Sequence, residues 1–185
     1  MVLDSARSIC LGCKERLRNL FKNLRYSPLA QRMHDLDRLL QTHFALEVIL
    51  FQLGEFVLAR EHFEKSIALY NPQKHSSHRA LQDPGVACLS YAALGLWSLC
   101  YPEQALKRSY EALTLAQELS HPFSLAVALN WTAWLHQYRR EEKLTQERAE
   151  TEIVLSSEQG FPFWVAFGTV LRGWALAEQG QVEEG

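Results

Sequence analysis

The sequence predicts an all-α protein in which antiparallel helix pairs repeat along the chain as an α-solenoid. Residues 55–70 carry one apolar stripe at helical spacing. Three later segments open with prolines, Pro84, Pro122 and Pro162, which are separated by 38 and 40 residues. Apolar residues three and four apart are typical of amphipathic helices. A near-constant period of about 40 residues is typical of repeats that stack on their neighbours.

The segment 55–70 is the clearest helix of the chain. Ala59, Phe63 and Ile67 lie four residues apart, so they share one helix face. Several residues between them are charged, which suits a face exposed to water. Gly54 can adopt a positive φ and end the preceding helix. The pattern therefore predicts the second helix of a pair, placed after a tight glycine turn.

Residues 1–34 are expected to form a basic helical segment. The first 43 residues hold eight Lys or Arg against four Asp or Glu, whereas the rest of the chain holds eleven against seventeen. Such an excess fits a solvated helix face, or an arm that touches an acidic partner, RNA or the acidic part of its own chain. The apolar stripe of this segment is Leu17, Leu20, Phe21 and Leu24, and the basic residues around it are Lys14, Arg16, Arg18, Lys22 and Arg25.

The repeats that follow have boundaries marked by turn residues and prolines. Proline suits the first helical turn, where its missing N–H would have no partner within the helix. We expect repeats at 35–70, 84–119, 122–159 and 161–185, with a polar linker at 71–83. The expected turn positions inside the repeats are Gly54, Cys100, Arg139 and Gly180, and the expected helix crossings are at Ala59, Ala105 and, less tightly packed, Leu144.

The last repeat is incomplete, because the sequence stops where a partner helix should begin. The apolar helix expected at 162–179 would then lack its cover. Solenoids normally end in a polar cap. We therefore expect either a fragment of a longer protein or self-association through this uncapped helix.

A family resemblance is carried by Leu53-Gly54-Glu55-Phe56 followed by Ala59, Phe63 and Pro72, which resembles the tetratricopeptide repeat. The segments 83–91 and 118–126 resemble the helical-repeat region of large bacterial signalling ATPases. The resemblance covers roughly residues 30–185 and implies a right-handed superhelix. It also implies a role in protein–protein interaction or regulation, with any NTPase activity residing in other modules.

The resemblance places a partner-binding groove on the first helix of each pair. Aromatic and apolar residues in such a groove suit a helix or an extended peptide of a protein partner. Because long helices drift in register, Trp97 is equally compatible with the groove and the core, and Trp174 fits the core better. The groove residues carried over by position are Phe44, Val48, Phe51, Gln52, Ser90, Leu94, Trp97, Leu129, Asn130, Ala133, His136 and Trp174.

An alternative function is the sensing of a small-molecule effector by an aromatic pocket, formed by Trp131, Trp134, His136 and Trp164.

An enzyme is not expected, because the sequence has no glycine-rich phosphate loop, GxSxG or HExxH motif. No cofactor or metal is expected either. The pair Cys10 and Cys13 lacks the further ligands of a structural zinc site, and His75-Ser76-Ser77-His78 has no carboxylate at ligand spacing.

Composition and charge place the chain among cytoplasmic proteins. The four cysteines show no disulfide framework, so reduced thiols fit best. We see no signal peptide and no run of 18 apolar residues. A formal net charge of −2 gives no reason to expect nucleic acid or a membrane as the partner.

Overall fold

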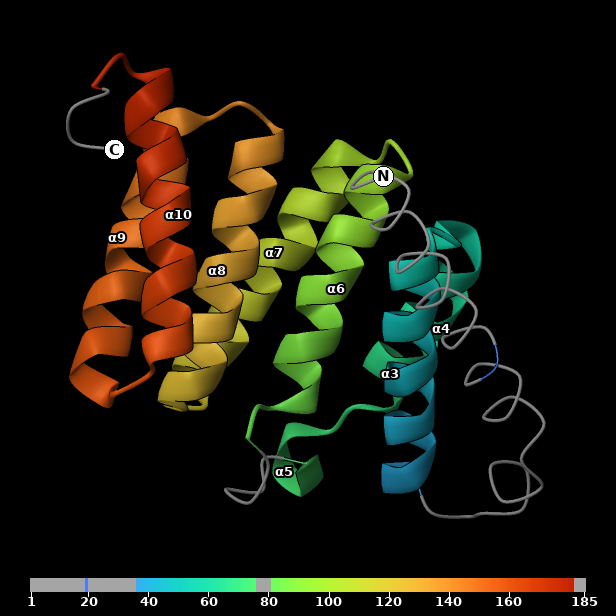
Figure 1. Ribbon diagram of the computed structural model, residues 1–185. Coiled ribbons are helices and arrows are strands. Elements are labelled where there is room, and N and C mark those ends of the chain that lie inside the picture. The colour runs from blue at the N-terminus through green and yellow to red at the C-terminus, as the bar shows by residue number, and fades with distance from the viewer. Residues whose placement is uncertain (1–18, 20–35, 76–80, 182–185) are drawn as a thin grey trace. The chain divides into compact units, whose positions relative to one another are not determined.

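The computed structural model describes residues 19, 36–75 and 81–181. Within these ranges all regular secondary structure is helical, which confirms the expected all-α class (Figure 1). The chain divides into two compact units, one ending at Tyr70 and the other beginning at Asn71. The expected basic segment 1–34, including Cys10 and Cys13, lies outside the described residues, apart from residue 19.

The first unit holds the helix pair formed by α3 (Leu36–Leu53) and α4 (Phe56–Leu69). Gly54 has a φ of 81°, and the N–H of Glu55 donates to the carbonyl oxygen of Leu50 at 2.9 Å. This bond closes α3 in the manner of a Schellman cap. Ala59 and Phe63 are almost fully buried, so the apolar stripe faces α3 as its spacing predicts.

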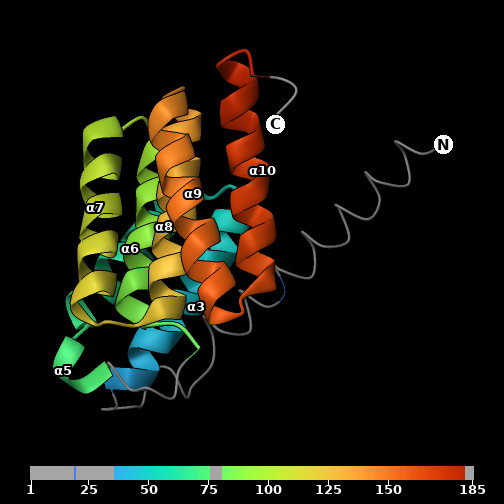
Figure 2. The same ribbon diagram turned by 90° about the vertical axis from the view of Figure 1, so that its left-hand side faces the viewer.

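The second unit consists of two layers of helices. It holds α5 (Pro72–His75), α6 (Pro84–Ser98), α7 (Pro102–Glu118), α8 (Pro122–Tyr138), α9 (Glu142–Gln159) and α10 (Pro162–Glu178). The helix α8 packs against α6 and α10, and these three form one layer. The helices α7 and α9 form the other layer, and each packs against helices of the first (Figures 1 and 2).

Local sequence explains where these helices begin. Pro84, Pro102, Pro122 and Pro162 stand at the first position of α6, α7, α8 and α10. Asp83 caps α6, because its Oδ1 accepts a hydrogen bond from the N–H of Val86 at 3.0 Å. The N–H of Asp83 in turn donates to the buried Oγ of Ser124 at 2.8 Å, which ties the start of α6 to the start of α8.

The turn between α8 and α9 corrects one expectation. The left-handed residue is Arg140, with a φ of 59°, rather than Arg139. The N–H of Glu141 donates to the carbonyl oxygen of His136 at 3.0 Å, so the cap is again of the Schellman type. The one-residue shift carries into α9, where Thr145 is fully buried and Leu144 is only partly buried. A small residue therefore occupies this crossing.

Candidate functional site

The layer formed by α6, α8 and α10 carries very few charged side chains. The helix α6 has none, and α8 has no Lys, Arg, Asp or Glu and a single histidine, His136. The helix α10 has Arg172 and Glu178. In contrast, α7 and α9 carry charged residues along most of their length. The two layers of the second unit therefore present surfaces of different chemistry.

A continuous run of aromatic rings crosses the layer formed by α6, α8 and α10. The ring centroids of Tyr91 and Trp131 are 4.9 Å apart, and those of Trp131 and Trp134 are 5.3 Å apart. Trp134 lies 6.4 Å from Phe167, which lies 4.8 Å from Phe163. These spacings are those of interacting aromatic pairs. We call these five residues the aromatic face.

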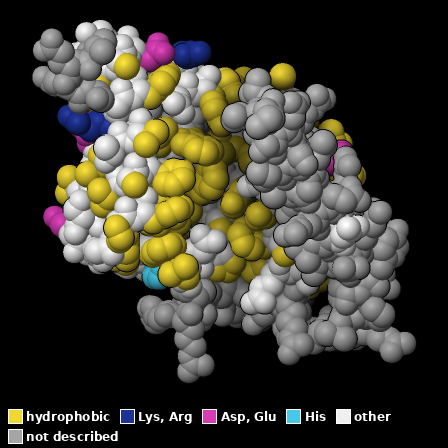
Figure 3. Space-filling view, viewed as in Figure 1, with side chains coloured by type: hydrophobic (Ala, Val, Ile, Leu, Met, Phe, Trp, Pro, Cys, Tyr) yellow, Lys and Arg dark blue, Asp and Glu magenta, His cyan; other side chains and the backbone are white. Residues whose placement is uncertain are grey.

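The aromatic face is accessible from outside the molecule. Phe163 is 59% exposed, and the other four residues are partly buried. In Figure 3, hydrophobic side chains gather over α8 and α10 on the side seen in Figure 1. Residues three or four apart share a helix face, which explains why Trp131 accompanies Trp134 and Phe163 accompanies Phe167.

Six of the twelve groove residues expected from the sequence are buried, and this part of the prediction is wrong. Their exposed fractions are 3% or less, so a partner cannot reach them. The face expected to point outward instead packs inside the helix layers: Nδ2 of Asn130 donates a 3.1 Å hydrogen bond to Oε1 of Glu152 in α9. The buried residues are Ser90, Leu94, Leu129, Asn130, Ala133 and His136.

The other six groove residues remain accessible to different degrees. Gln52 is exposed, and the rest are partly buried. Phe51 also packs edge to face on Phe56, with ring centroids 5.5 Å apart. Their role in a groove stays a prediction for Phe44, Val48, Phe51, Gln52, Trp97 and Trp174.

The aromatic pocket expected for an effector is partly assembled. Trp131 contacts Trp134, and both Trp134 and Trp164 contact Phe167, with ring centroids 6.4 and 6.2 Å away. His136 belongs elsewhere, because its side chain is 1% exposed and its Nδ1 lies 2.6 Å from Oε2 of Glu141. The pocket prediction was therefore wrong for His136.

His136 contributes instead to a polar cluster at the α8–α9 turn. Oε1 of Glu141 accepts a hydrogen bond from Nε of Arg139 at 2.9 Å. Partial burial is the largest influence on Glu141 and raises its pKa, but the hydrogen bonds from His136 and Arg139 outweigh it and leave the pKa below its ordinary value. The carboxylate form of Glu141 thus stabilises the α8–α9 turn through its hydrogen bonds with His136 and Arg139.

A second polar pair lies in the interior between α8, α9 and α10. Glu152 is fully buried, and Nδ2 of Asn130 donates to both of its carboxyl oxygens at 3.1 and 3.2 Å. Burial raises the pKa of Glu152 to about 8, although the hydrogen bond from Asn130 lowers it in part. Sequence reasoning missed this residue, because a Glu on a strongly charged helix is indistinguishable from a solvated one.

A small recess adjoins the aromatic face at the ends of α8 and α10. It has a volume of about 300 Å³ and is lined by Gln137, Tyr138, Arg140 and Trp174. The ring of Tyr138 lies 6.3 Å from that of Trp134. Arg140 is held by Glu178, with Nη1 3.2 Å from Oε1. The recess therefore extends the aromatic face toward polar groups.

Metal ligands do not assemble in the part of the chain that the structure describes, where no group of three or more His, Cys, Asp or Glu side chains could hold an ion. His43 and His62 share a 2.8 Å hydrogen bond in the first unit, but they are only two. Ser76, Ser77 and His78 of the expected HSSH motif lie outside the described residues. None of the described helices is long and apolar enough to cross a membrane.

Comparison with known proteins identifies a fold but no family. No protein-family model matches the chain, and no curated protein matches it. Among solved structures, the chain is similar to BtubC (BKLC) from P. vanneervenii, with a TM-score of 0.67 and 16% sequence identity. The match covers 98% of this chain and 71% of BtubC. At this identity the likeness shows a shared helical fold.

Proposed function

We propose that the chain is a non-catalytic helical-repeat module whose aromatic face binds an apolar segment of a protein partner. The observation that carries the proposal is the unbroken run of rings from Tyr91 to Phe163 over three helices. Aromatic side chains supply much of the binding energy in protein interfaces. A cluster of apolar side chains at the surface is typical of interaction sites.

The chemistry of the layer formed by α6, α8 and α10 restricts the partner. A charged side chain buried against α6 or α8 would find no counter-ion on those helices, and an unpaired buried charge is strongly unfavourable. The partner therefore presents an uncharged apolar stripe. An amphipathic helix or an extended peptide can present such a stripe.

The proposal is tested by selecting peptides from a display library on the full chain and titrating the best binders by calorimetry. Replacing the exposed Phe163 by Ala should weaken binding by a factor of ten or more, as expected for an aromatic anchor. Val57→Ala, at a residue that is 67% exposed in the first unit, is the control and should bind normally. Equal affinity of both variants would contradict the assignment.

The family relationship is a second part of the proposal. The resemblance of segments 83–91 and 118–126 supports a fragment or relative of a multidomain bacterial signalling ATPase, acting in the cytoplasm. Successive helices from α6 to α10 lie alternately in one layer and in the other, which supports the solenoid arrangement of that family. Sequencing the DNA that flanks the coding region of these residues tests this. We expect it to encode an NTPase module that is continuous with this chain.

A small-molecule effector is the alternative function, favoured by the recess of about 300 Å³ beside Trp174. Convergent aromatic and polar groups are typical of ligand sites. Titration with a set of metabolites, followed by tryptophan fluorescence, separates the two functions. If small effectors bind and no peptide does, the proposed scaffold function is wrong.

A further inference from the structure

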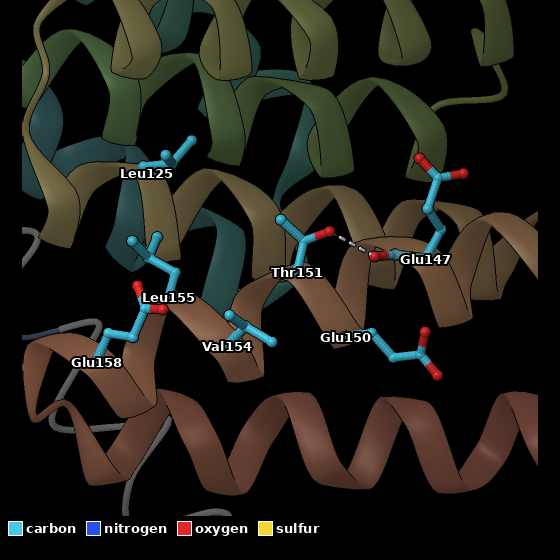
Figure 4. Close-up of a pocket in the computed structure, with 7 residues that line it drawn as sticks. All are labelled: Leu125, Glu147, Glu150, Thr151, Val154, Leu155 and Glu158. Atoms are coloured by element: carbon cyan, nitrogen blue, oxygen red, sulfur yellow. Dashed lines mark hydrogen bonds between the residues drawn. The ribbon is translucent and has the colours of Figure 1, made fainter.

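A shallow groove runs along the charged side of α9, away from the aromatic face. It has a volume of about 500 Å³ and lies between α9 and Leu125 of α8 (Figure 4). Its apolar part is formed by Leu125, Val154 and Leu155. Val154 is 59% exposed, although it lies on a helix that is otherwise strongly charged. The groove thus offers an apolar strip that no described side chain covers.

Acidic side chains border this strip at both ends. Glu147 lies at one end and Glu158 at the other, eleven residues apart on the same helix. Eleven residues of α-helix span about 16 Å and return to nearly the same face. Glu150 also lines the groove but points to the other side of α9 from Glu147 (Figure 4), where Nε of Arg172 holds it at 3.3 Å.

The two end glutamates are both accessible to a partner. The side chain of Glu147 is 59% exposed, and its nearest cation, Nη1 of Arg148, lies 3.6 Å away. Glu158 is exposed and forms no ion pair within the described part of the chain. An apolar strip between two exposed acids is complementary to an amphipathic helix with basic residues at both ends of its apolar stripe.

The chain itself contains a segment with this chemistry. In residues 14–25, Leu17, Leu20, Phe21 and Leu24 have the spacing of one helix face. Lys14 and Arg25 stand at the ends of the stripe, eleven residues apart. This separation equals that of Glu147 and Glu158, so the helix that the spacing predicts for residues 14–25 would place a base opposite an acid at each end when laid along α9.

We propose that the groove on α9 binds residues 14–25 of a second copy of this chain. The apolar stripe of the segment covers Val154 and Leu155, and its terminal bases face the two end glutamates. The opposite charges of the first 43 residues and the rest of the chain favour the same association. The interaction uses a different surface from the aromatic face and does not depend on the proposed function.

The test is a charge swap in the full chain, followed by analytical ultracentrifugation. One variant carries Glu147→Lys and Glu158→Lys, and the other carries Lys14→Glu and Arg25→Glu. Each variant alone should self-associate at least tenfold more weakly than the wild type. An equimolar mixture should recover the association as a heterodimer, because the reversed groove then meets the reversed segment, and the unaltered groove meets the unaltered segment.

Controls separate this result from a general charge effect or from misfolding. Glu61→Lys with Glu103→Lys makes the same change in net charge as the groove variant, at exposed sites outside the groove, and should leave the association unchanged. Circular dichroism melts should show that every variant folds. A wild-type chain that is monomeric at all concentrations overturns the proposal. Association that survives in both swap variants, or a mixture that stays monomeric, overturns it as well.

Discussion

At the scale of single residues, Glu152 is the group whose surroundings differ most from those of its neighbours along α9. It is fully buried, and its hydrogen-bond partner is the neutral amide of Asn130. With its pKa raised to about 8 by burial, the side chain is mostly a neutral acid at pH 7. A neutral acid suits this interior position, because a charge there would lack a counter-ion.

The protonation of Glu152 leads to a prediction about pH. The pKa is about 8 in the folded chain and takes its ordinary value of 4.5 in the unfolded chain. Between these values only the folded state binds the proton, so the free energy of unfolding should fall with rising pH, by up to about 1.4 kcal/mol per unit. It should level off above pH 8. Glu152→Gln removes this contribution, which urea unfolding at several pH values would measure.

The exposed Glu150 supplies the control for this experiment. Glu150→Gln changes the same functional group two residues away on the same helix, where the side chain is 46% exposed. Its unfolding free energy should follow the pH dependence of the wild type. If the Glu152→Gln profile also parallels the wild type between pH 5 and pH 8, then Glu152 is charged in the folded protein and the argument is wrong.

Gly168 shows how the same interior restricts side-chain size. A Cβ atom there would lie 2.8 Å from Cγ1 of Ile153 and 3.2 Å from the carbonyl oxygen of Ala149. Helix propensity alone would make Gly168→Ala stabilising by about 1 kcal/mol. Because the backbone of α9 must move, we expect a loss of about 1–3 kcal/mol instead. Chemical denaturation would measure it, with Thr169→Ala at the exposed neighbour as the control, which should not lose stability.

At the scale of elements, the turns between helices carry backbone conformations that their residues do not favour. Cys100, Ser120 and Arg140 have φ values of 63°, 50° and 59°. The left-handed region costs a residue with a Cβ atom about 1–2 kcal/mol relative to its ordinary conformation. Glycine occupies the corresponding position at Gly54 and Gly160. The helix ends therefore impose the conformation on whichever residue is present.

Cys100 is the position at which this strain is most easily tested. It is exposed and follows Leu99, the C-terminal cap of α6. Cys100→Gly should stabilise the protein by a few tenths to about 1 kcal/mol, since relief of the strain exceeds the greater flexibility of glycine in the unfolded chain. Cys100→Ala keeps the Cβ atom and should change little. Equal unfolding midpoints in urea for the two variants would argue against strain at this turn.

The helices were predictable from sequence because their signals are local, whereas the accessible face was not. Proline at a first helical position and apolar spacing act within a few residues, so the start of α6 at Pro84 follows from the sequence. Which side of α8 is buried depends on α7 and α9. A shift of one residue exchanges the buried Asn130 for the partly exposed Trp131, and no local signal decides between them. The Arg139 prediction failed by the same single residue.

At the scale of the whole molecule, the second unit separates a layer with very few charged side chains from a strongly charged one. This separation follows from composition, because α6 and α8 have no Lys, Arg, Asp or Glu, whereas α7 and α9 alternate acids and bases. The proposed partner site lies on the first layer and the proposed self-association groove on the second. The two interactions should therefore respond differently to the same solution conditions.

Ionic strength tests this assignment of two interactions to two layers. Salt shortens the Debye length from about 10 Å at 0.1 M to about 3 Å at 1 M, so contacts between exposed charges weaken while apolar contacts do not. Between 50 and 500 mM NaCl, the Kd of a peptide bound at the aromatic face should change less than twofold. The Kd of self-association should rise at least tenfold, because exposed Glu147 and Glu158 contribute to it. Calorimetry measures the Kd of the peptide, and ultracentrifugation of the same preparation measures the Kd of self-association. If salt weakened peptide binding and left self-association unchanged, the two interactions would be assigned to the wrong layers.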